Sequence, residues 1–504
     1  MAFESPTRGP SIARNAFHLV LGQVTTTALA IFFSAALGRS LGARDFGLYF
    51  LISSFSTFAY VVVDWGMQYY VIREVARTPE RAGEVLGTVL VLRTACSLLI
   101  LLPAALMVLA LGYDARTSWF SVAYLVVSLP FFLAQGFGLV FRGRDRMGLD
   151  SAISVVNKAA VLALALGALA LGTGLTGVVA SQMIAGIIAI AVSSWFYGRC
   201  ALSPITFSAQ TIRAMVAGSK ALGFMMVAAS VQPYLDAIVL SKLAPADAIG
   251  WYGAAKNIMG TLTAPAIIVA AAAFPQLART SSEPAAFNVE VRTVLRPILW
   301  LGALAAVGSY LFSDDAIAVV YGQRHFAPAG VILRVFAPGF FLLFIDNLLG
   351  NALTAMGRMA ALSLVKSASV VLSTGLELLL IPYFQRRVGN GGIGVVTAFM
   401  ASEVVMFGGA ALLMPRGAVG RPVIVDIARA IASAVITGLF FHLIPPVNLF
   451  IGVPLCVTVF VACTVALRLL RRADLEQLKA LFRRGQPAEP ETSRTASAWR
   501  AGRA

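Results

Sequence analysis

Long apolar runs, separated by short polar or glycine- and proline-containing segments, recur along the chain from end to end. Each run is long enough to cross a hydrocarbon layer of about 30 Å as a helix. Segments of about ten residues that alternate apolar and polar positions, the pattern of membrane β-strands, are not visible. Hydropathy predicts about fourteen helical spans: residues 16–38, 47–70, 86–111, 119–141, 151–172, 176–197, 222–243, 250–274, 296–313, 330–354, 360–382, 392–414, 425–444 and 447–468.

The composition leads to the same class of protein. Of the 504 residues, 59% are hydrophobic and 12% are charged, whereas soluble domains average about 45–50% apolar and about 25% charged residues. A water-soluble core cannot bury this excess of apolar side chains. The sequence therefore predicts an all-α polytopic membrane protein.

The net charge of +16 is distributed unevenly over the predicted topology. One face collects 28 of the 39 basic residues, the other face holds 8, and Lys158, Lys256 and Lys366 fall inside spans. Basic loops mark the cytoplasmic side of membrane proteins. The bias predicts that both termini are cytoplasmic in a bacterial inner membrane, and it explains the positive charge without a nucleic-acid partner.

A central connection divides the chain into two similar halves. We expect a six-helix bundle over residues 1–200, a connection along the membrane surface over 201–221, and a second six-helix bundle over 222–415. Two extra spans over 416–468 precede a basic tail over 469–504, which combines an amphipathic helix with a segment of disordered composition. The predicted outer loops are short and leave no room for the soluble domain of a glycan-assembling enzyme.

The sequence of the turn between the first two spans occurs a second time in the chain. ARDFGLYFLISSF (43–55) matches PADAIGWYGAAKNI (245–258), so Gly47 corresponds to Gly250. Later matches of Pro130 with Pro338 and of Lys158 with Lys366 keep nearly the same offset. Such a repeat predicts two parallel bundles related by an axis along the membrane normal. The turns themselves are interpreted as scaffold, because glycine and aromatic residues suit a tight turn at the membrane surface.

Four stretches make the chain resemble one transporter family. They are LGRSLGARDFGLYF (37–50), REVAR (73–77), YLDAIVLSKLAPADAIGWYGAAKNI (234–258) and the pattern VVYGQRHFAPAG…LRVFAPGFF…N…LTAMGR (319–358). With the duplicated helices, they resemble the polysaccharide-transporter branch of the multidrug/oligosaccharidyl-lipid/polysaccharide flippase superfamily, over about residues 12–415.

The resemblance implies two six-helix bundles arranged in a V around a cavity that opens alternately to each side of the membrane. It also implies a substrate, an isoprenoid-pyrophosphate-linked oligosaccharide moved from the cytoplasmic to the outer leaflet for O-antigen, capsule or exopolysaccharide biosynthesis. Membrane lipid is a further expected partner, and a polysaccharide polymerase or export machinery is a possible one.

Ionisable residues inside spans are costly, and each is therefore a candidate for function. Lys256 is the foremost substrate-binding candidate, because a cation in the eighth span could pair with a pyrophosphate, although it could also snorkel to the surface. By resemblance, cavity-lining positions concentrate on the first, second, seventh and eighth spans. The other expected cavity residues are Asn257, Gln23, Tyr234 and Tyr252.

Asp236, Asp64 and Arg93 are candidates for ion coupling or gating. Asp236 could pair with Lys256 or bind the coupling cation, H⁺ or Na⁺, and Asp64 could pair with Arg73 or Arg93. Lys158 and Lys366 could extend a basic track, although snorkelling is the favoured interpretation. No metal-ligand spacing, cofactor motif or ATP-binding loop is found in the sequence, so we expect no cofactor and no enzymatic activity.

Three alternatives to the flippase remain open. A cation-coupled multidrug exporter of the same superfamily would favour an acidic cavity, whereas the lysines inside the spans favour a basic one. An integral-membrane enzyme of glycan assembly is disfavoured by the short outer loops. A non-transporting scaffold of a glycan-export complex could use the basic tail for docking.

Overall fold

The structure is a computed structural model that describes residues 9–200 and 202–469, and over these residues it is all-helical. In chain order the elements are α1 (Gly9–Asp64), α2 (Met67–Arg77), the 3₁₀ turn η1 (Pro79–Arg81), α3 (Ala82–Ala110), α4 (Ala115–Gly143), α5 (Met147–Ala170), α6 (Gly174–Arg199), α7 (Ala209–Ser230), α8 (Gln232–Leu243), α9 (Ala246–Thr280), α10 (Pro284–Tyr321), α11 (Gln323–Ala355), α12 (Met359–Val388), α13 (Gly391–Leu413), α14 (Arg421–Leu443) and α15 (Leu449–Ala466).

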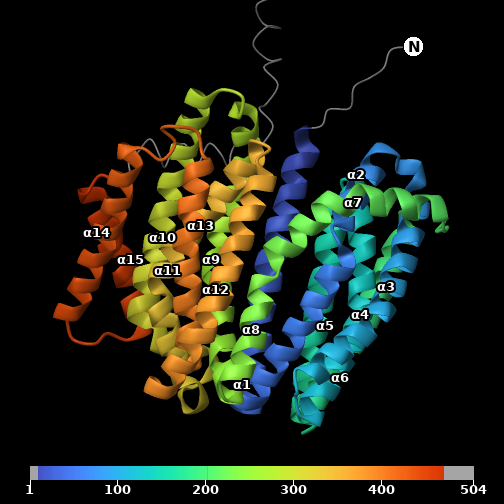
Figure 1. Cartoon of the computed structure of the whole chain (residues 1–504), viewed down its shortest axis with the longest axis horizontal. Coiled ribbons are helices and arrows are strands. Elements are labelled where there is room, and N and C mark those ends of the chain that lie inside the picture. The colour runs from blue at the N-terminus through green and yellow to red at the C-terminus, as the bar shows by residue number, and fades with distance from the viewer. Residues whose placement is uncertain (1–8, 201, 470–504) are drawn as a thin grey trace, which may run out of the picture.

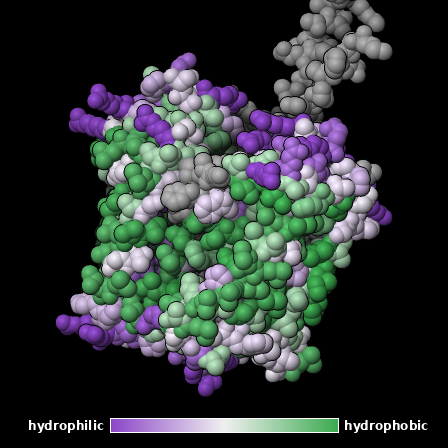
Figure 2. Space-filling view, turned by 45° about the vertical axis from the view of Figure 1, so that its right-hand side comes forward, coloured by the Kyte–Doolittle hydropathy of each residue, from purple (hydrophilic) through white to green (hydrophobic). Residues whose placement is uncertain are grey.

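The predicted fold class is confirmed. Among the described residues, twelve helices are long and apolar enough to cross a membrane. The first of them, α1, contains two spans, and the broken pair α7 and α8 supplies another, which gives the expected number of about fourteen. Figure 2 shows a broad belt of hydrophobic side chains between two hydrophilic ends, as a lipid-facing surface requires.

The helices form two bundles (Figure 1). In one, α1 packs with α4 and α5, and α6 packs against both α4 and α5; in the other, α9 to α11 pack together and α13 covers α11 and α12. Helices α14 and α15 pack on the outside of α10. We call the face where α1 begins the terminal face, and the face that holds the turn inside α1 and the α8–α9 turn the hairpin face.

The turn inside α1 depends on Gly42. Its backbone has φ 73° and ψ 178°, a conformation almost restricted to glycine, and it divides the helix into two spans. This is the turn that the sequence motif 37–50 predicts between the first two spans. The motif's second copy lies at the start of α9, directly after the short α8–α9 connection.

Two helices differ from the predicted spans. The second span was expected to reach residue 70, but α1 ends at Asp64, because Trp65 and Gly66 take positive φ values and α2 starts anew. The seventh span was expected to begin at residue 222, but α7 begins at Ala209 and breaks after Ser230. Pro233 lies in the first turn of α8 and cannot donate the backbone hydrogen bond that would continue α7.

The two bundles meet at the hairpin face. Leu37 and Phe46 of α1 pack with Tyr321 of α10 and Phe326 of α11 in one buried cluster. The ring of Phe46 makes edge contacts with both Tyr321 and Phe326, with centroids 5.5 Å apart in each case. Arg39 adds hydrogen bonds from α1 to the carbonyl oxygens of Val319 and Val320 at the end of α10. The hairpin face is therefore closed between the bundles.

Several sequence predictions fall outside these observations. The amphipathic helix and the disordered composition of the tail concern residues 469–504, nearly all of which lie outside the described residues. The domain boundaries at residues 200, 221, 415 and 468 stay predictions, as does the orientation of the termini.

Candidate functional site

A buried charge cluster joins α8 to α9. Lys256 Nζ lies 3.2 Å from Asp236 Oδ2, and Tyr252, one helical turn before Lys256, donates a hydrogen bond of 2.8 Å to the same carboxylate oxygen. Lys256 Nζ also donates to the Tyr252 hydroxyl oxygen at 2.9 Å. The Asp236 side chain is 3% exposed and that of Lys256 is 26% exposed. The lysine therefore pairs between α8 and α9 rather than snorkelling to the surface.

A second carboxylate belongs to this cluster. Glu377 of α12, a helix that packs against α8, interacts electrostatically with Asp236, and Ser373, one turn earlier, donates to Glu377 Oε1 at 3.3 Å. Glu377 is fully buried, and its Oε2 atom has no hydrogen-bond partner. Two carboxyl groups this close repel each other when both are charged, unless they share a proton or another cation. The sequence alone does not single out Glu377, because an isolated acid in a span is also typical of polar contacts between helices.

Asn257 faces a different neighbour from Lys256. Its side-chain amide donates to Ser34 of α1 at 2.8 Å, and Ser34 is hydrogen-bonded to the Tyr321 hydroxyl at 2.7 Å. Asn257 thus ties α9 to α1 across the two bundles. A cavity-lining role for Asn257 stays a prediction, but its described contacts are interhelical.

Gln23 and Tyr234 are not part of the cluster. Gln23 is exposed on α1 and donates a hydrogen bond to Thr27, one turn further along the same helix. Tyr234 is half-buried on α8, two residues before Asp236, and positions two apart point to different sides of a helix. Their predicted substrate contacts remain untested.

Asp64 and Arg93 form a second ion pair, in the other bundle. Of the two partners considered for Asp64, the structure selects Arg93 of α3. Arg93 is almost fully buried, donates to the carbonyl oxygen of Phe132 at 2.8 Å and lies 4.2 Å from the centroid of the Phe132 ring. Arg93 is therefore held inside the bundle and does not snorkel to the surface.

This ion pair lies in the wall of a polar cavity of about 500 Å³ between helices α1 to α6. Lys158 of α5 lines the same cavity, together with Asn157 and the ion pair between Arg142 and Asp150. Lys366, its counterpart in the repeat, lies instead near two buried acids, Asp346 of α11 and Glu403 of α13, and interacts electrostatically with both. The two lysines therefore do not form one continuous basic track.

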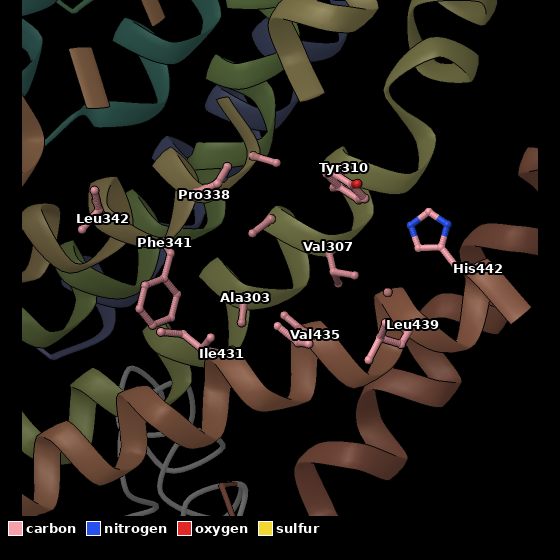
Figure 3. Close-up of a pocket in the computed structure, with 14 residues that line it drawn as sticks. Ala303, Val307, Tyr310, Pro338, Phe341, Leu342, Ile431, Val435, Leu439 and His442 are labelled. Atoms are coloured by element: carbon pink, nitrogen blue, oxygen red, sulfur yellow. The ribbon is translucent and has the colours of Figure 1, made fainter. Parts of the chain in front are cut away.

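An apolar cavity of about 620 Å³ lies between α10, α11 and α14 (Figure 3). Val307, Phe341 and Leu439 are among the side chains that line it, and Tyr310 and His442 lie together at one end. Its wall lacks the charged side chains that a pyrophosphate group requires. It suits a hydrocarbon chain rather than a headgroup.

Fold and charge clusters together define a polytopic helical membrane protein with two bundles and ionisable groups inside each. A family model described as "Polysaccharide biosynthesis protein" matches residues 12–281, and the chain belongs to this family. A relative from Haloferax volcanii, named "Probable low-salt glycan biosynthesis flippase Agl15", is 22% identical over 396 residues, covering 77% of this chain and 80% of the relative. A relative from Shigella flexneri, named "Putative O-antigen transporter", is 22% identical over 382 residues, covering 72% of this chain and 89% of the relative.

Solved structures share the fold. The lipid II flippase MurJ, in an inward closed conformation, matches with a TM-score of 0.72 and 13% identity, over 91% of this chain and all of that one. A multidrug resistance MATE family transporter in an inward-facing conformation matches with a TM-score of 0.66 and 14% identity, over 80% of this chain and 98% of that one. The chain thus shares the fold of these transporters, and the family match and the names of the two relatives agree with the predicted transporter rather than an enzyme.

Proposed function

We propose that this protein is a secondary-active flippase that moves an isoprenoid-pyrophosphate-linked oligosaccharide from the cytoplasmic to the outer leaflet by alternating access. The glycan serves envelope polysaccharide biosynthesis. Family membership and the relatives named as a glycan biosynthesis flippase and an O-antigen transporter support the substrate class. The predominance of basic residues on the terminal face supports a cytoplasmic position for both ends in a bacterial inner membrane.

The observation that carries the proposal is the contact between Lys256 and Asp236. A pyrophosphate cannot enter the membrane without compensating cations, and Lys256 is a cation whose side chain remains partly exposed. In the structure its charge is neutralised by Asp236. When the Asp236–Glu377 pair takes up H⁺ or Na⁺, Lys256 is released to attract the anionic headgroup. Binding of the coupling ion and of the substrate are linked through one carboxylate.

The lipid part of the substrate needs a separate place. The apolar cavity between α10, α11 and α14 has the wall chemistry for a hydrocarbon chain, while the headgroup remains with Lys256. This division keeps the isoprenoid in a lipid-like environment during transport. A polysaccharide polymerase or export complex that takes up the flipped product is a further proposed partner.

A cation-coupled multidrug exporter is the second candidate. The fold likeness to the MATE transporter and the buried acids Asp236 and Glu377 favour it, because carboxylates can bind a cationic drug. Against the exporter, Asp236 is already paired with Lys256, and a cationic drug would have to displace the lysine. The family match also favours the glycan.

Reconstituted vesicles distinguish the two candidates. The protein is inserted into liposomes that contain a fluorescent isoprenoid-pyrophosphate disaccharide, and its appearance in the other leaflet is measured by quenching from outside. We expect transport by the wild type, loss of transport in Lys256→Ala, and retention in Lys242→Ala, a matched lysine of α8. Uptake of an organic cation without movement of the disaccharide would establish the exporter instead.

A further inference from the structure

The polar cavity of the N-terminal bundle has no part in the mechanism proposed above. It is lined by α1 to α6, whereas Lys256 and Asp236 belong to α9 and α8. Its volume of about 500 Å³ lies within the range of small-molecule sites, about 300–1,000 Å³. The cavity is therefore large enough to hold a ligand of its own.

Its wall is built from regularly spaced polar side chains. On α1, Ser56, Tyr60 and Asp64 follow one another at intervals of four residues and line the cavity together. Gln135 of α4 and Ser154 of α5 face it from two further helices. Residues four apart lie on one side of a helix, so each helix presents a polar stripe to the same space. Hydroxyl and amide groups of this kind both donate and accept hydrogen bonds.

Two buried polar atoms of the wall are left without a partner. Asn157 is 3% exposed and Arg93 is 2% exposed, and neither Asn157 Oδ1 nor Arg93 Nε has a hydrogen-bond partner. Leaving a buried acceptor or donor unpaired is unfavourable. Asn157 Oδ1 is an acceptor and Arg93 Nε is a donor. A hydroxyl-rich ligand could satisfy both atoms, because a hydroxyl group can donate one hydrogen bond and accept another.

The charges of the wall favour a neutral or singly anionic ligand. Asp64 is paired with Arg93, and Asp150 accepts a 2.6 Å hydrogen bond from Arg142 Nε. Lys158 is a further cation in the wall, and its side chain is exposed. Two ion pairs plus one lysine give the cavity an excess of one positive charge.

We propose that this cavity is a saccharide-binding site that takes a hydroxyl-rich sugar, with an acidic group of the sugar directed to Lys158. Asn157 and Arg93 satisfy their unpaired atoms on the sugar hydroxyls, and Gln135 contributes a further amide. The inference rests on the proposed function for the source of the sugar, which is the glycan end of the lipid-linked substrate. The pyrophosphate and the sugar would then be held by different bundles.

Binding of free sugars to the full-length protein in lipid nanodiscs tests this site without transport. Glucose, glucuronate and the organic cation tetraphenylphosphonium are titrated separately into the millimolar range, and saturation-transfer NMR reports contact with the protein. We expect saturable binding of both sugars, with glucuronate tighter than glucose. Lys158→Gln should remove the difference between the two sugars and leave glucose binding in place.

Two cavity variants and two controls complete the experiment. Asn157→Ala and Gln135→Ala should each weaken both sugars by about tenfold, the equivalent of one lost hydrogen bond to the ligand. Gln135 is exposed in the cavity, so its variant keeps the test valid if Asn157→Ala misfolds. Asn347→Ala, the matched change in α11 of the other bundle, should bind like the wild type.

Lys256→Met separates this inference from the proposed function. It should abolish disaccharide flipping while sugar binding stays unchanged. If the wild type flips the disaccharide but binds neither sugar, or if both cavity variants bind sugars like the wild type, the inference is overturned and the proposed function stands. Saturable binding of tetraphenylphosphonium in place of the sugars overturns the inference as well.

Discussion

Gly47 of α1 packs directly against Gly250 of α9, and these two glycines are equivalent positions of the internal repeat. A Cβ atom on Gly250 would lie 2.0 Å from the carbonyl oxygen of Ala43, and one on Gly47 would lie 2.7 Å from the backbone nitrogen of Gly250. The absence of both side chains lets the two helices touch backbone to backbone, as small residues do in membrane interfaces. The repeated turn is thus the contact between the bundles at the hairpin face.

Gly250→Ala should open this contact. The added methyl meets backbone atoms that cannot move aside by a rotamer change, so we expect the closed hairpin face to lose about 1–3 kcal/mol. The measurement is maleimide labelling of Ser34→Cys, a residue 6% exposed between α1 and α10, with the four native cysteines replaced by alanine. Labelling should accelerate in Gly250→Ala.

The control for this experiment is Gly260→Ala, on the same helix. A Cβ atom at Gly260 meets nothing within 4 Å, so labelling should stay at the wild-type rate. Equal labelling rates in Gly250→Ala and the wild type would show that the glycine contact does not hold the bundles together.

The number of spans and the repeat could be predicted from the sequence, because both depend on the order of apolar runs and turns along the chain. The pairing of Lys256 with Asp236 was also accessible as one of two alternatives, since the residues lie on consecutive spans. Glu377 was not, because α12 follows α8 by more than a hundred residues and only the packing of the bundle brings the two together. The end of the second span at Trp65 was missed because α1 ends where Trp65 and Gly66 take positive φ values, and hydropathy does not report backbone conformation.

The sequence contains a pattern of polar residues that belongs to the polar cavity, but a hydropathy profile does not detect it. Ser56, Tyr60 and Asp64 are isolated polar positions in an apolar run, and each alone is typical of helix packing. Their spacing of four places them on one face of α1, and similar stripes occur on α4 and α5. That these stripes face one another could not be predicted, because it depends on the rotation of each helix within the bundle.

Lys256→Met should destabilise the protein as well as stop transport. It leaves the Asp236 carboxylate, 3% exposed, without its cation, and breaking a buried pair in this way costs about 3–5 kcal/mol. The double variant Asp236→Asn with Lys256→Met removes both charges and should regain most of the lost stability, but not transport. Thermal unfolding in detergent and the flipping assay measure the two effects separately.

An exposed ion pair serves as the control for that series. Arg116 and Asp45 are 3.0 Å apart at the hairpin face, with side chains 50% and 27% exposed. Arg116→Ala should change stability by less than about 1 kcal/mol, because water screens the pair. Regained transport in the double variant would mean that neither charge takes part in flipping.

Arg93→Lys should behave as a disruptive substitution although it keeps the charge. The guanidinium of Arg93 reaches Asp64 and the carbonyl oxygen of Phe132 at once, with the Phe132 ring beneath it. A lysine ammonium cannot reproduce this planar geometry. We expect a clear loss of thermal stability, whereas Arg142→Lys, whose side chain is 41% exposed, should change it little. Equal stabilities of the two variants would contradict a structural role for the guanidinium.

Gly42→Ala isolates the effect of backbone conformation in the turn of α1. A Cβ atom at Gly42 meets no other atom within 4 Å, so the variant creates no clash. The residue must still adopt φ 73° and ψ 178°, which costs a non-glycine residue about 1–3 kcal/mol. Gly260→Ala adds the same methyl into equally open space inside a helix, where alanine is preferred and should stabilise by about 0.4–1 kcal/mol. The two variants should therefore shift the thermal unfolding temperature in opposite directions, and a shift of the same sign would show that the turn does not depend on glycine.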